Sequence, residues 1–232
     1  MEYKQLGNTD IMIPEIGFGT WNYKGTHTPI HRAIELGANH IDTAEIYGTE
    51  SAVGKAVVSS PHRSFIATKV WNNHLRYRDV IQSAMQSLKT LGIQQIDLYY
   101  IHLPNPSIAI TDTMQAFEEL VDRGVIRFIG VSNFSVAQLK EAQDALKKYP
   151  IVANQVLYNF QNRNIEKELI PYCDTNEITI VGYTPFGHNI VDIESGLGKS
   201  RLDNVLDQIS QEISKTKSQI ALNWCEIGRA HV

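Results

Sequence analysis

The sequence lacks the features of several protein classes. It has only two cysteines, Cys173 and Cys225, and their spacing fits neither a metal-ligand motif nor a disulfide framework, which suits a reducing compartment. The amino terminus, MEYKQLGNTD, has no apolar signal core, and no apolar run approaches the ~20 residues of a membrane-spanning helix. We therefore expect a cytoplasmic protein with no metal centre and no membrane partner.

Neither sign of charge dominates the chain. Its 232 residues include 21 Lys and Arg and 25 Asp and Glu, for a net charge of −4, and the basic residues are scattered rather than gathered in a stripe. This distribution argues against nucleic acid and anionic membranes as partners. With 43% hydrophobic residues and no low-complexity tract, the chain is typical of one large α/β domain. Nothing in the sequence defines an oligomeric state.

Short apolar runs alternate with segments of helical period along the chain. Residues 2–21 alternate apolar and polar side chains around Gly7 and Asn8, which predicts a small hairpin. Further on, residues 78–92 and 111–124 repeat apolar side chains at helical spacing and end in a glycine, the second with Thr111 or Asp112 as the expected N-cap. Alternating strands and helices predict a parallel sheet.

Each of six strand-like runs ends in a polar or hydrogen-bonding residue. The six ends follow one another at intervals of 23 to 33 residues, about one βα unit each, and they are Asp42, Lys69, His102, Ser132 with Asn133, Gln155, and Tyr183. In a (β/α)₈ TIM barrel this rim holds the active site, because packed apolar layers fill the interior. A doubly wound sheet is the rival fold, but no G-x-G-x-x-G follows the first strand.

The rim residues suit the reduction of a carbonyl group. If a bound nicotinamide donates hydride to the carbonyl carbon, the oxygen gains negative charge and needs a proton. Tyr47 can donate that proton, and a nearby ammonium on Lys69, held by Asp42, would ease its release. His102 can donate a second hydrogen bond to the same oxygen. These four are the predicted catalytic residues.

Each of the four also has an ordinary structural interpretation. Asp42 could cap a helix, Lys69 could be solvated, Tyr47 could pack with only its hydroxyl wet, and His102 could be a structural histidine. Their arrival at neighbouring strand ends favours a shared site, because unrelated surface residues would not collect there.

The remaining strand-end residues suit a flat ring that bears an amide. Ser132, Asn133 and Gln155 offer neutral donors and acceptors for a carboxamide, while Tyr183 offers a face for stacking. The stretch YTPFGHN that begins at Tyr183 could cover phosphates or could be an ordinary turn.

Six stretches of the sequence closely resemble the aldo-keto reductases, in order from the hairpin to about Trp224. They are IGFGTW, HIDTAEIYG, ATKVW, IDLYYIHLPNP, EELVDRGVIRFIGVSNFS and NQVLYN. The resemblance implies a TIM barrel plugged by the hairpin, NADP(H) as cofactor, an aldehyde or ketone substrate and no metal. It implies Tyr47 as general acid, Asp42 and Lys69 as its activating pair, and His102 as the group that orients the carbonyl.

The resemblance also implies two sets of binding residues. The cofactor would contact Gly19, Thr20, Trp21, Ser132, Asn133, Gln155, Tyr183 and Thr184. The substrate would lie against Trp21, Tyr23, Trp71 and His102.

The carboxyl end departs from the family pattern. Only six strand runs are counted, and a complete barrel with its helices typically takes ~250 residues, so we expect an incomplete barrel over residues 1–226 with about six of eight strands. Residues 227–232, IGRAHV, can be encoded by ATC GGA AGA GCA CAC GTC, which reads like a sequencing adapter. We therefore expect these residues to be a non-native tail, with a natural short tail as the alternative.

The sequence is compatible with three functions. The first is an NADPH-dependent carbonyl reductase, and the second is a non-catalytic nucleotide-binding regulatory or sensor subunit of the same fold. The third is a barrel aldolase or isomerase that uses Lys69 as a Schiff base. The combination of Asp42, Tyr47 and Lys69 fits proton delivery better than Schiff-base chemistry.

Overall fold

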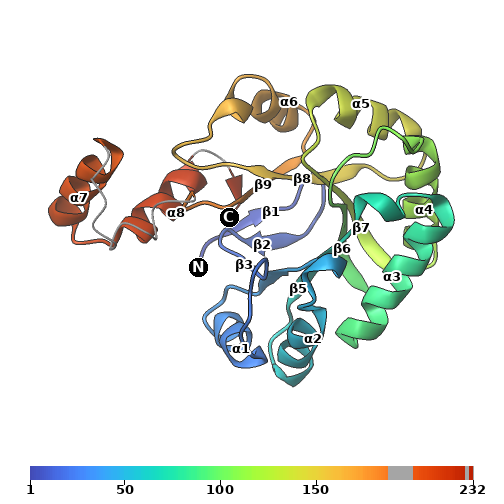
Figure 1. Cartoon of the computed structure of the whole chain (residues 1–232), viewed down its shortest axis with the longest axis horizontal. Coiled ribbons are helices and arrows are strands. Elements are labelled where there is room, and N and C mark those ends of the chain that lie inside the picture. Colours follow the sequence, from blue (N-terminus) through green and yellow to red (C-terminus); the bar gives the residue numbers. More distant parts are fainter. Residues whose placement is uncertain (188–200, 228–229, 232) are drawn as a thin grey trace.

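A parallel sheet of eight strands curls around a short N-terminal hairpin in the computed structural model of the chain (Figure 1). The structure describes residues 1–187, 201–227 and 230–231. The hairpin consists of β1 (Tyr3–Gln5) and β2 (Met12–Pro14), which pair in antiparallel fashion, as the sequence predicts.

The eight strands of the sheet are hydrogen-bonded in the order of the sequence, and every pair is parallel. A doubly wound sheet reverses its strand order at a switch point, so the sequential order excludes that rival fold. The strands are β3 (Phe18–Gly19), β4 (His40–Asp42), β5 (Phe65–Val70), β6 (Ile96–Ile101), β7 (Ile126–Ser132), β8 (Ile151–Leu157), β9 (Thr179–Tyr183) and β10 (Ala230–His231).

Helices α1 to α6 lie on the outer side of the curled sheet, and α7 and α8 follow β9 (Figure 1). Their bounds are α1 (His27–Glu35), α2 (Glu50–Ser59), α3 (Tyr77–Leu91), α4 (Ile110–Asp122), α5 (Val136–Ala145), α6 (Leu169–Thr175), α7 (Arg201–Ile213) and α8 (Lys217–Ile227). Among the described residues, the loops contain the 3₁₀ turns η1 (Glu45–Tyr47), η2 (Asn72–His74) and η3 (Asn164–Glu166).

The two helices expected from periodicity are α3 and α4. The left-handed residue that ends α3 is Gly92, at φ 67°, and Gly124 follows α4 with the same φ. The expected N-cap of α4 is wrong, because the cap position belongs to Ala109. Asp112 lies instead in the first turn, where a carboxylate interacts favourably with the helix dipole.

The sheet separates an inner core from an outer core. In β5, Phe65 and Ala67 face the hairpin side chains Leu6 and Ile13, all of them buried. Ile66 and Val70 of the same strand point outward and join the core beneath the helices. Because side chains alternate along a strand, Thr68 of β5 also points outward and Lys69 points inward.

The sheet corrects the strand count expected from the sequence. The predicted six strands correspond to β4 to β9, but β3 and β10 also belong to the sheet, so the expectation that two of eight strands are missing is not confirmed. Both extra strands have only two residues, too few for an alternating pattern. The expected non-native tail includes residues 228, 229 and 232, which lie outside the described residues, whereas Ala230 and His231 pair with β9.

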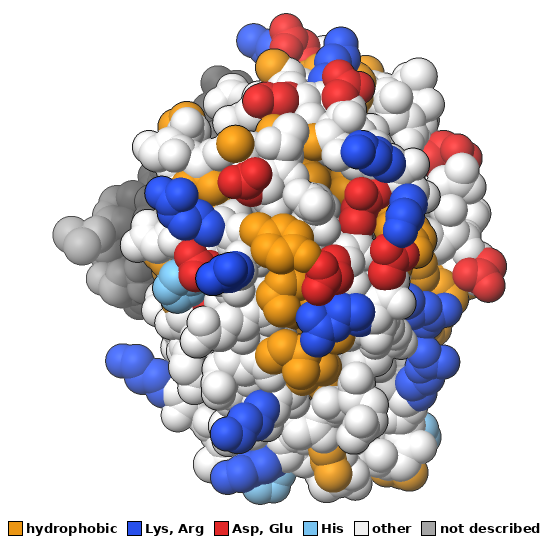
Figure 2. Space-filling view, turned by 90° about the vertical axis from the view of Figure 1, so that its right-hand side faces the viewer, with side chains coloured by type: hydrophobic (Ala, Val, Ile, Leu, Met, Phe, Trp, Pro, Cys, Tyr) orange, Lys and Arg blue, Asp and Glu red, His pale blue; other side chains and the backbone are white. Residues whose placement is uncertain are grey.

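Charges of both signs are interspersed on the face that lies over α3 and α4 (Figure 2). Two exposed ion pairs on this side join Arg123 to Glu119 and Lys148 to Asp122. Within residues 1–187, 201–227 and 230–231, the structure contains no helix that combines the length and the apolar character needed to cross a bilayer.

Candidate active site

The predicted site residues come together at the carboxyl ends of the strands. The strand register aligns Gly19 with Asp42 across β3 and β4, and Ser132 with Gln155 across β7 and β8. Lys69 stands near the end of β5, and Tyr183 is the last residue of β9. The prediction that these residues share one rim of the sheet is therefore confirmed.

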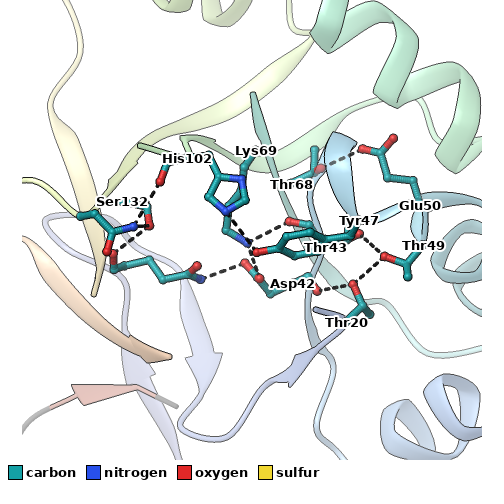
Figure 3. A network of polar contacts seen from close by, with 12 residues as sticks. Thr20, Asp42, Thr43, Tyr47, Thr49, Glu50, Thr68, Lys69, His102 and Ser132 are labelled. Atoms are coloured by element: carbon teal, nitrogen blue, oxygen red, sulfur yellow. Dashed lines mark hydrogen bonds and ion pairs between the residues drawn. The ribbon is translucent and has the colours of Figure 1, made fainter. Parts of the chain in front are cut away.

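A buried ion pair between Lys69 and Asp42 lies at the centre of this rim (Figure 3). The Lys69 side chain has no exposed surface, and its ammonium donates hydrogen bonds to Asp42 Oδ1 and, at 2.9 Å, to the carbonyl oxygen of Thr43. A buried ammonium needs such partners because it has lost its water. Burial lowers the pKa of Lys69, and the Asp42 carboxylate acts against that shift.

Tyr47 ends the η1 turn directly in front of the ion pair. Its hydroxyl lies 3.2 Å from His102 Nε2, and the Lys69 ammonium lies 5.1 Å from the centre of its ring. Burial raises the pKa of Tyr47, and the charge of Asp42 raises it further. The sequence argument expects Lys69 to ease proton release, whereas the net shift has the opposite sign, so the hydroxyl keeps its proton in the free protein.

His102 follows β6 and contacts two aromatic rings edge-on. Its ring centre lies 5.4 Å from that of Tyr47 and 5.1 Å from that of Trp71. Burial, with a further contribution from the Lys69 charge, lowers the pKa of His102 to about 4, so the imidazole is neutral near pH 7. Its Nδ1 is buried and has no hydrogen-bond partner among the described residues.

Gln155 links the ion pair to the neighbouring strands. Its side-chain amide donates to Asp42 Oδ2 at 2.9 Å, and its backbone carbonyl accepts from Ser132 Oγ at 2.9 Å. Asp42 therefore has one oxygen bound to Lys69 and the other bound to Gln155. Sequence reasoning placed Gln155 only on a carboxamide and did not foresee this bond.

Asn133 connects the same group to Tyr183. Its side-chain nitrogen lies 3.0 Å from Ser132 Oγ and donates to the carbonyl oxygen of His102 at 3.2 Å, and its oxygen accepts from the Tyr183 hydroxyl at 2.9 Å. Its backbone adopts φ 63°, which asparagine tolerates better than most residues. The Asn133 amide thus links the hydroxyls of Ser132 and Tyr183 into one hydrogen-bonded row beside the catalytic cluster.

Three threonines form a buried support that sequence reasoning missed in part. The hydroxyl of Thr20 donates to the backbone oxygen of Asp42 at 3.0 Å, and Thr49 lies 2.9 Å from the hydroxyls of both Thr20 and Thr43 (Figure 3). Thr20 was expected beside the cofactor, and the structure places its side chain in this network. Thr43 and Thr49 flank Tyr47 in the sequence, which is the signal that could have identified them.

The residues expected to contact the substrate differ in their surroundings. Trp71 packs against His102, but Trp21 is 60% exposed, and Tyr23 packs edge-on against Phe18. The Tyr23 hydroxyl donates a hydrogen bond to the carbonyl oxygen of Thr26 at 2.6 Å.

Thr184 holds the turn after β9 through its backbone. It adopts φ 55°, and its backbone oxygen accepts from Asn159 and from the amide of Gly187. The stretch YTPFGHN, for which a loop over phosphates and an ordinary turn are both open, continues into residues 188 and 189, which lie outside the described residues.

In the part of the chain that the structure describes, no cluster of three or more His, Cys, Asp or Glu side chains is placed to hold a metal ion. The polar groups of the rim are instead hydroxyls, amides and one ion pair, which suit proton transfer and hydrogen bonding to an organic ligand.

A sequence model described as the aldo/keto reductase family matches residues 15–227. The chain belongs to the aldo/keto reductase family. Two curated relatives in this family are named reductases. The 9,11-endoperoxide prostaglandin H2 reductase of Trypanosoma cruzi is 33% identical, over 94% of this chain and 75% of that protein. A methylglyoxal reductase of Escherichia coli is 32% identical, over 93% of this chain and 78% of that protein.

Solved aldo-keto reductases share the fold over the whole chain or nearly so. A thermostable aldo-keto reductase in complex with the inhibitor epalrestat is 38% identical, with a TM-score of 0.89 over 100% of this chain and 87% of its own. An aldo/keto reductase from Klebsiella pneumoniae in complex with NADP and acetate is 28% identical, with a TM-score of 0.79 over 92% of this chain and 77% of its own. The curled parallel sheet is therefore the fold of the family.

Proposed function

We propose that this chain reduces aldehydes or ketones to alcohols with hydride from NADPH, and that Tyr47 is the general acid. The observation that carries the proposal is the 3.2 Å approach of the Tyr47 hydroxyl to His102 Nε2, in front of the buried Lys69–Asp42 pair. A proton donor and a second hydrogen-bonding group then meet at one point, where a carbonyl oxygen can bind to both.

Bound NADPH would supply the hydride, whose two electrons form the new C–H bond while the C=O π electrons move to oxygen. The Tyr47 hydroxyl gives its proton to that oxygen, and the resulting phenolate lies near the Lys69 ammonium. In the free protein the raised pKa of Tyr47 keeps the donor protonated until charge develops on the substrate. Neutral His102 can then orient the carbonyl through Nε2 without a charge of its own.

The row of neutral groups would hold the nicotinamide. Ser132, Asn133 and Gln155 offer hydroxyl and amide groups that suit a carboxamide. Ser132 Oγ is hydrogen-bonded to the Asn133 amide and to the backbone carbonyl of Gln155, and the Asn133 amide also donates to the carbonyl oxygen of His102. The half-buried ring of Tyr183, whose hydroxyl is anchored to Asn133, would stack against the nicotinamide. The NADP bound in the related Klebsiella structure supports the choice of cofactor.

Trp71 would form the wall of the carbonyl site, because its ring already contacts His102. Trp21 and Tyr23 would complete the wall, as the resemblance to the family implies, with few polar anchors to select one carbonyl compound. The methylglyoxal reductase among the relatives supports small aldehydes as first substrates to examine.

The burial of Lys69 argues against a Schiff base as the alternative chemistry. Its side chain has no exposed surface, and its nitrogen is bound to Asp42 and to the carbonyl oxygen of Thr43. A substrate carbonyl would have to displace both partners to reach the nitrogen. A purely regulatory role would not require the Tyr47–His102 approach.

The proposal is tested by following NADPH absorbance with a panel of aldehydes and ketones that includes methylglyoxal. We expect turnover with several aldehydes, and loss of that turnover in Tyr47→Phe. Absence of NADPH oxidation with every member of the panel, in a folded preparation, would contradict the proposed reaction. Trapping of a carbonyl compound on Lys69 by borohydride would favour the aldolase alternative.

A further inference from the structure

A carboxylate on the outer side of the catalytic cluster joins two of its loops. Glu45 Oε1 accepts a hydrogen bond from the backbone amide of Trp71 and lies 2.9 Å from Nδ1 of His74. The Glu45 side chain is only 16% exposed, whereas that of His74 is 52% exposed. The bond to the Trp71 amide is therefore the better shielded of the two.

The two loops bear residues that surround His102. Glu45 begins the η1 turn, and Tyr47 ends it, so the carboxylate and the proton donor share one rigid turn of backbone. Trp71 is the first residue after β5 and caps the η2 turn, and its ring lies 5.1 Å from that of His102. The hydrogen bond between the Glu45 carboxylate and the Trp71 amide thus connects the turn that carries Tyr47 to the turn that begins at Trp71.

A second hydrogen bond holds the loop that carries Tyr47. Lys69 of β5 donates to the carbonyl oxygen of Thr43, which fixes the start of this loop. Glu45 fixes the loop two residues later, through the backbone amide of Trp71. Because the chain between Thr43 and Tyr47 is short, these two attachments together set the depth of the Tyr47 ring in the site.

We propose that Glu45 is a positioning residue, which keeps the Tyr47 hydroxyl and the Trp71 ring in place around His102. The inference rests on the proposed function, since it matters only if Tyr47 donates a proton to a carbonyl bound beside Trp71. A carboxylate is a strong acceptor for a backbone amide, and a shift of ~1 Å in a catalytic group can lower a rate by about 10²-fold.

Three variants separate this role from general stability. Glu45→Ala removes the acceptor, and Glu45→Gln keeps an oxygen of the same size and place. Glu45 lines a cavity of about 380 Å³, so shortening its side chain enlarges an open space and we expect the variant to fold. Asp97→Ala is the matched control, because Asp97 Oδ2 accepts from the backbone amide of Ile66 at 2.9 Å, near the opposite end of the same strand β5.

The measurements are kcat and KM for several aldehydes, the Kd for NADPH from fluorescence quenching, and the melting temperature. For Glu45→Ala we expect kcat/KM to fall by about 10-fold to 10²-fold with the Kd for NADPH within twofold of wild type. The fall should include a lower kcat, from the displaced Tyr47, and a higher KM for the carbonyl, from the displaced Trp71. Glu45→Gln should recover most of the loss, and Asp97→Ala should lower the melting temperature while kcat/KM stays within about threefold.

Several results would overturn the positioning role. Glu45→Ala with normal kcat/KM would do so, as would a Glu45→Gln variant as impaired as Glu45→Ala, or an Asp97→Ala variant that loses as much activity. Tyr47→Phe, measured beside them, keeps the two proposals apart. If Tyr47→Phe is inactive while Glu45→Ala has normal kcat/KM, only the positioning role fails. If Tyr47→Phe stays active, the proposed function itself fails.

Discussion

Tyr47→Phe removes a single hydroxyl from the centre of the site and leaves the ring in place. The lost contact is the 3.2 Å approach to His102 Nε2, while the edge-on packing of the two rings and the 5.1 Å approach of the Lys69 ammonium to the ring do not depend on the hydroxyl. One neutral hydrogen bond contributes about 0.5–1.5 kcal/mol to the free energy of unfolding, so the variant should fold with nearly normal stability.

The effect on catalysis should be much larger than the effect on stability. General acid catalysis contributes about 10²-fold to 10⁴-fold in rate, which corresponds to about 3–5 kcal/mol of transition-state stabilisation. We therefore expect kcat for aldehydes to fall by at least 10²-fold. The Kd for NADPH should stay within about threefold of wild type, because the proposed cofactor contacts are made by residues of β7, β8 and β9.

The assay follows NADPH absorbance at saturating cofactor with at least three aldehydes, together with NADPH fluorescence quenching and thermal unfolding. A variant with near wild-type kcat on these aldehydes would refute Tyr47 as the general acid. A variant that loses NADPH affinity and turnover together would show that the ring, not the proton, had been disturbed.

Three further predictions concern the cofactor, the imidazole and the helix packing. Tyr183→Phe keeps the stacking face and should bind NADPH within about twofold of wild type, whereas Tyr183→Ala should weaken the Kd about threefold to tenfold by fluorescence quenching; equal affinities would argue against stacking. Because the pKa of His102 is held at about 4, the unfolded chain binds more protons than the folded chain between about pH 6.5 and pH 4, and stability falls as the pH drops through that window. His102→Asn should show a smaller loss of urea stability between pH 7 and pH 5 than wild type, and an equal loss would contradict the assigned cause. In Gly54→Ala the new Cβ would lie 2.1 Å from the carbonyl oxygen of Leu91, so α2 and α3 must separate, and we expect urea unfolding to report a loss of about 1–3 kcal/mol; unchanged stability would refute this packing argument.

The strand ends were predictable because they depend on local rules. A strand buried on both faces reads as a continuous apolar run, and the residue where the run stops marks the rim of a parallel sheet. Asp42, Lys69 and Ser132 were placed at the rim in this way, and the structure confirms their placement. Their catalytic and binding roles remain proposals.

Short elements escaped the sequence analysis because they have no periodicity. Phe18 and Gly19 form β3 within a stretch that was assigned to the hairpin, and only pairing with Ile41 and Asp42 identifies them as a strand. The same holds for β10, which is defined by its pairing with β9. Two residues cannot display a pattern of period two, so their assignment depends on the neighbour they pair with.

The βα order, the identity of the polar residues at the rim and the resemblance to the family can all be read from the amino-acid sequence. How those residues bind to one another follows from the folded chain. Gln155 is bound to Asp42 although 113 residues separate them, and Glu45 reaches the backbone of Trp71 across two loops. The sign of the Tyr47 pKa shift likewise depends on burial and on the distance to Asp42. These quantities are set by through-space packing and desolvation, which local sequence patterns do not encode.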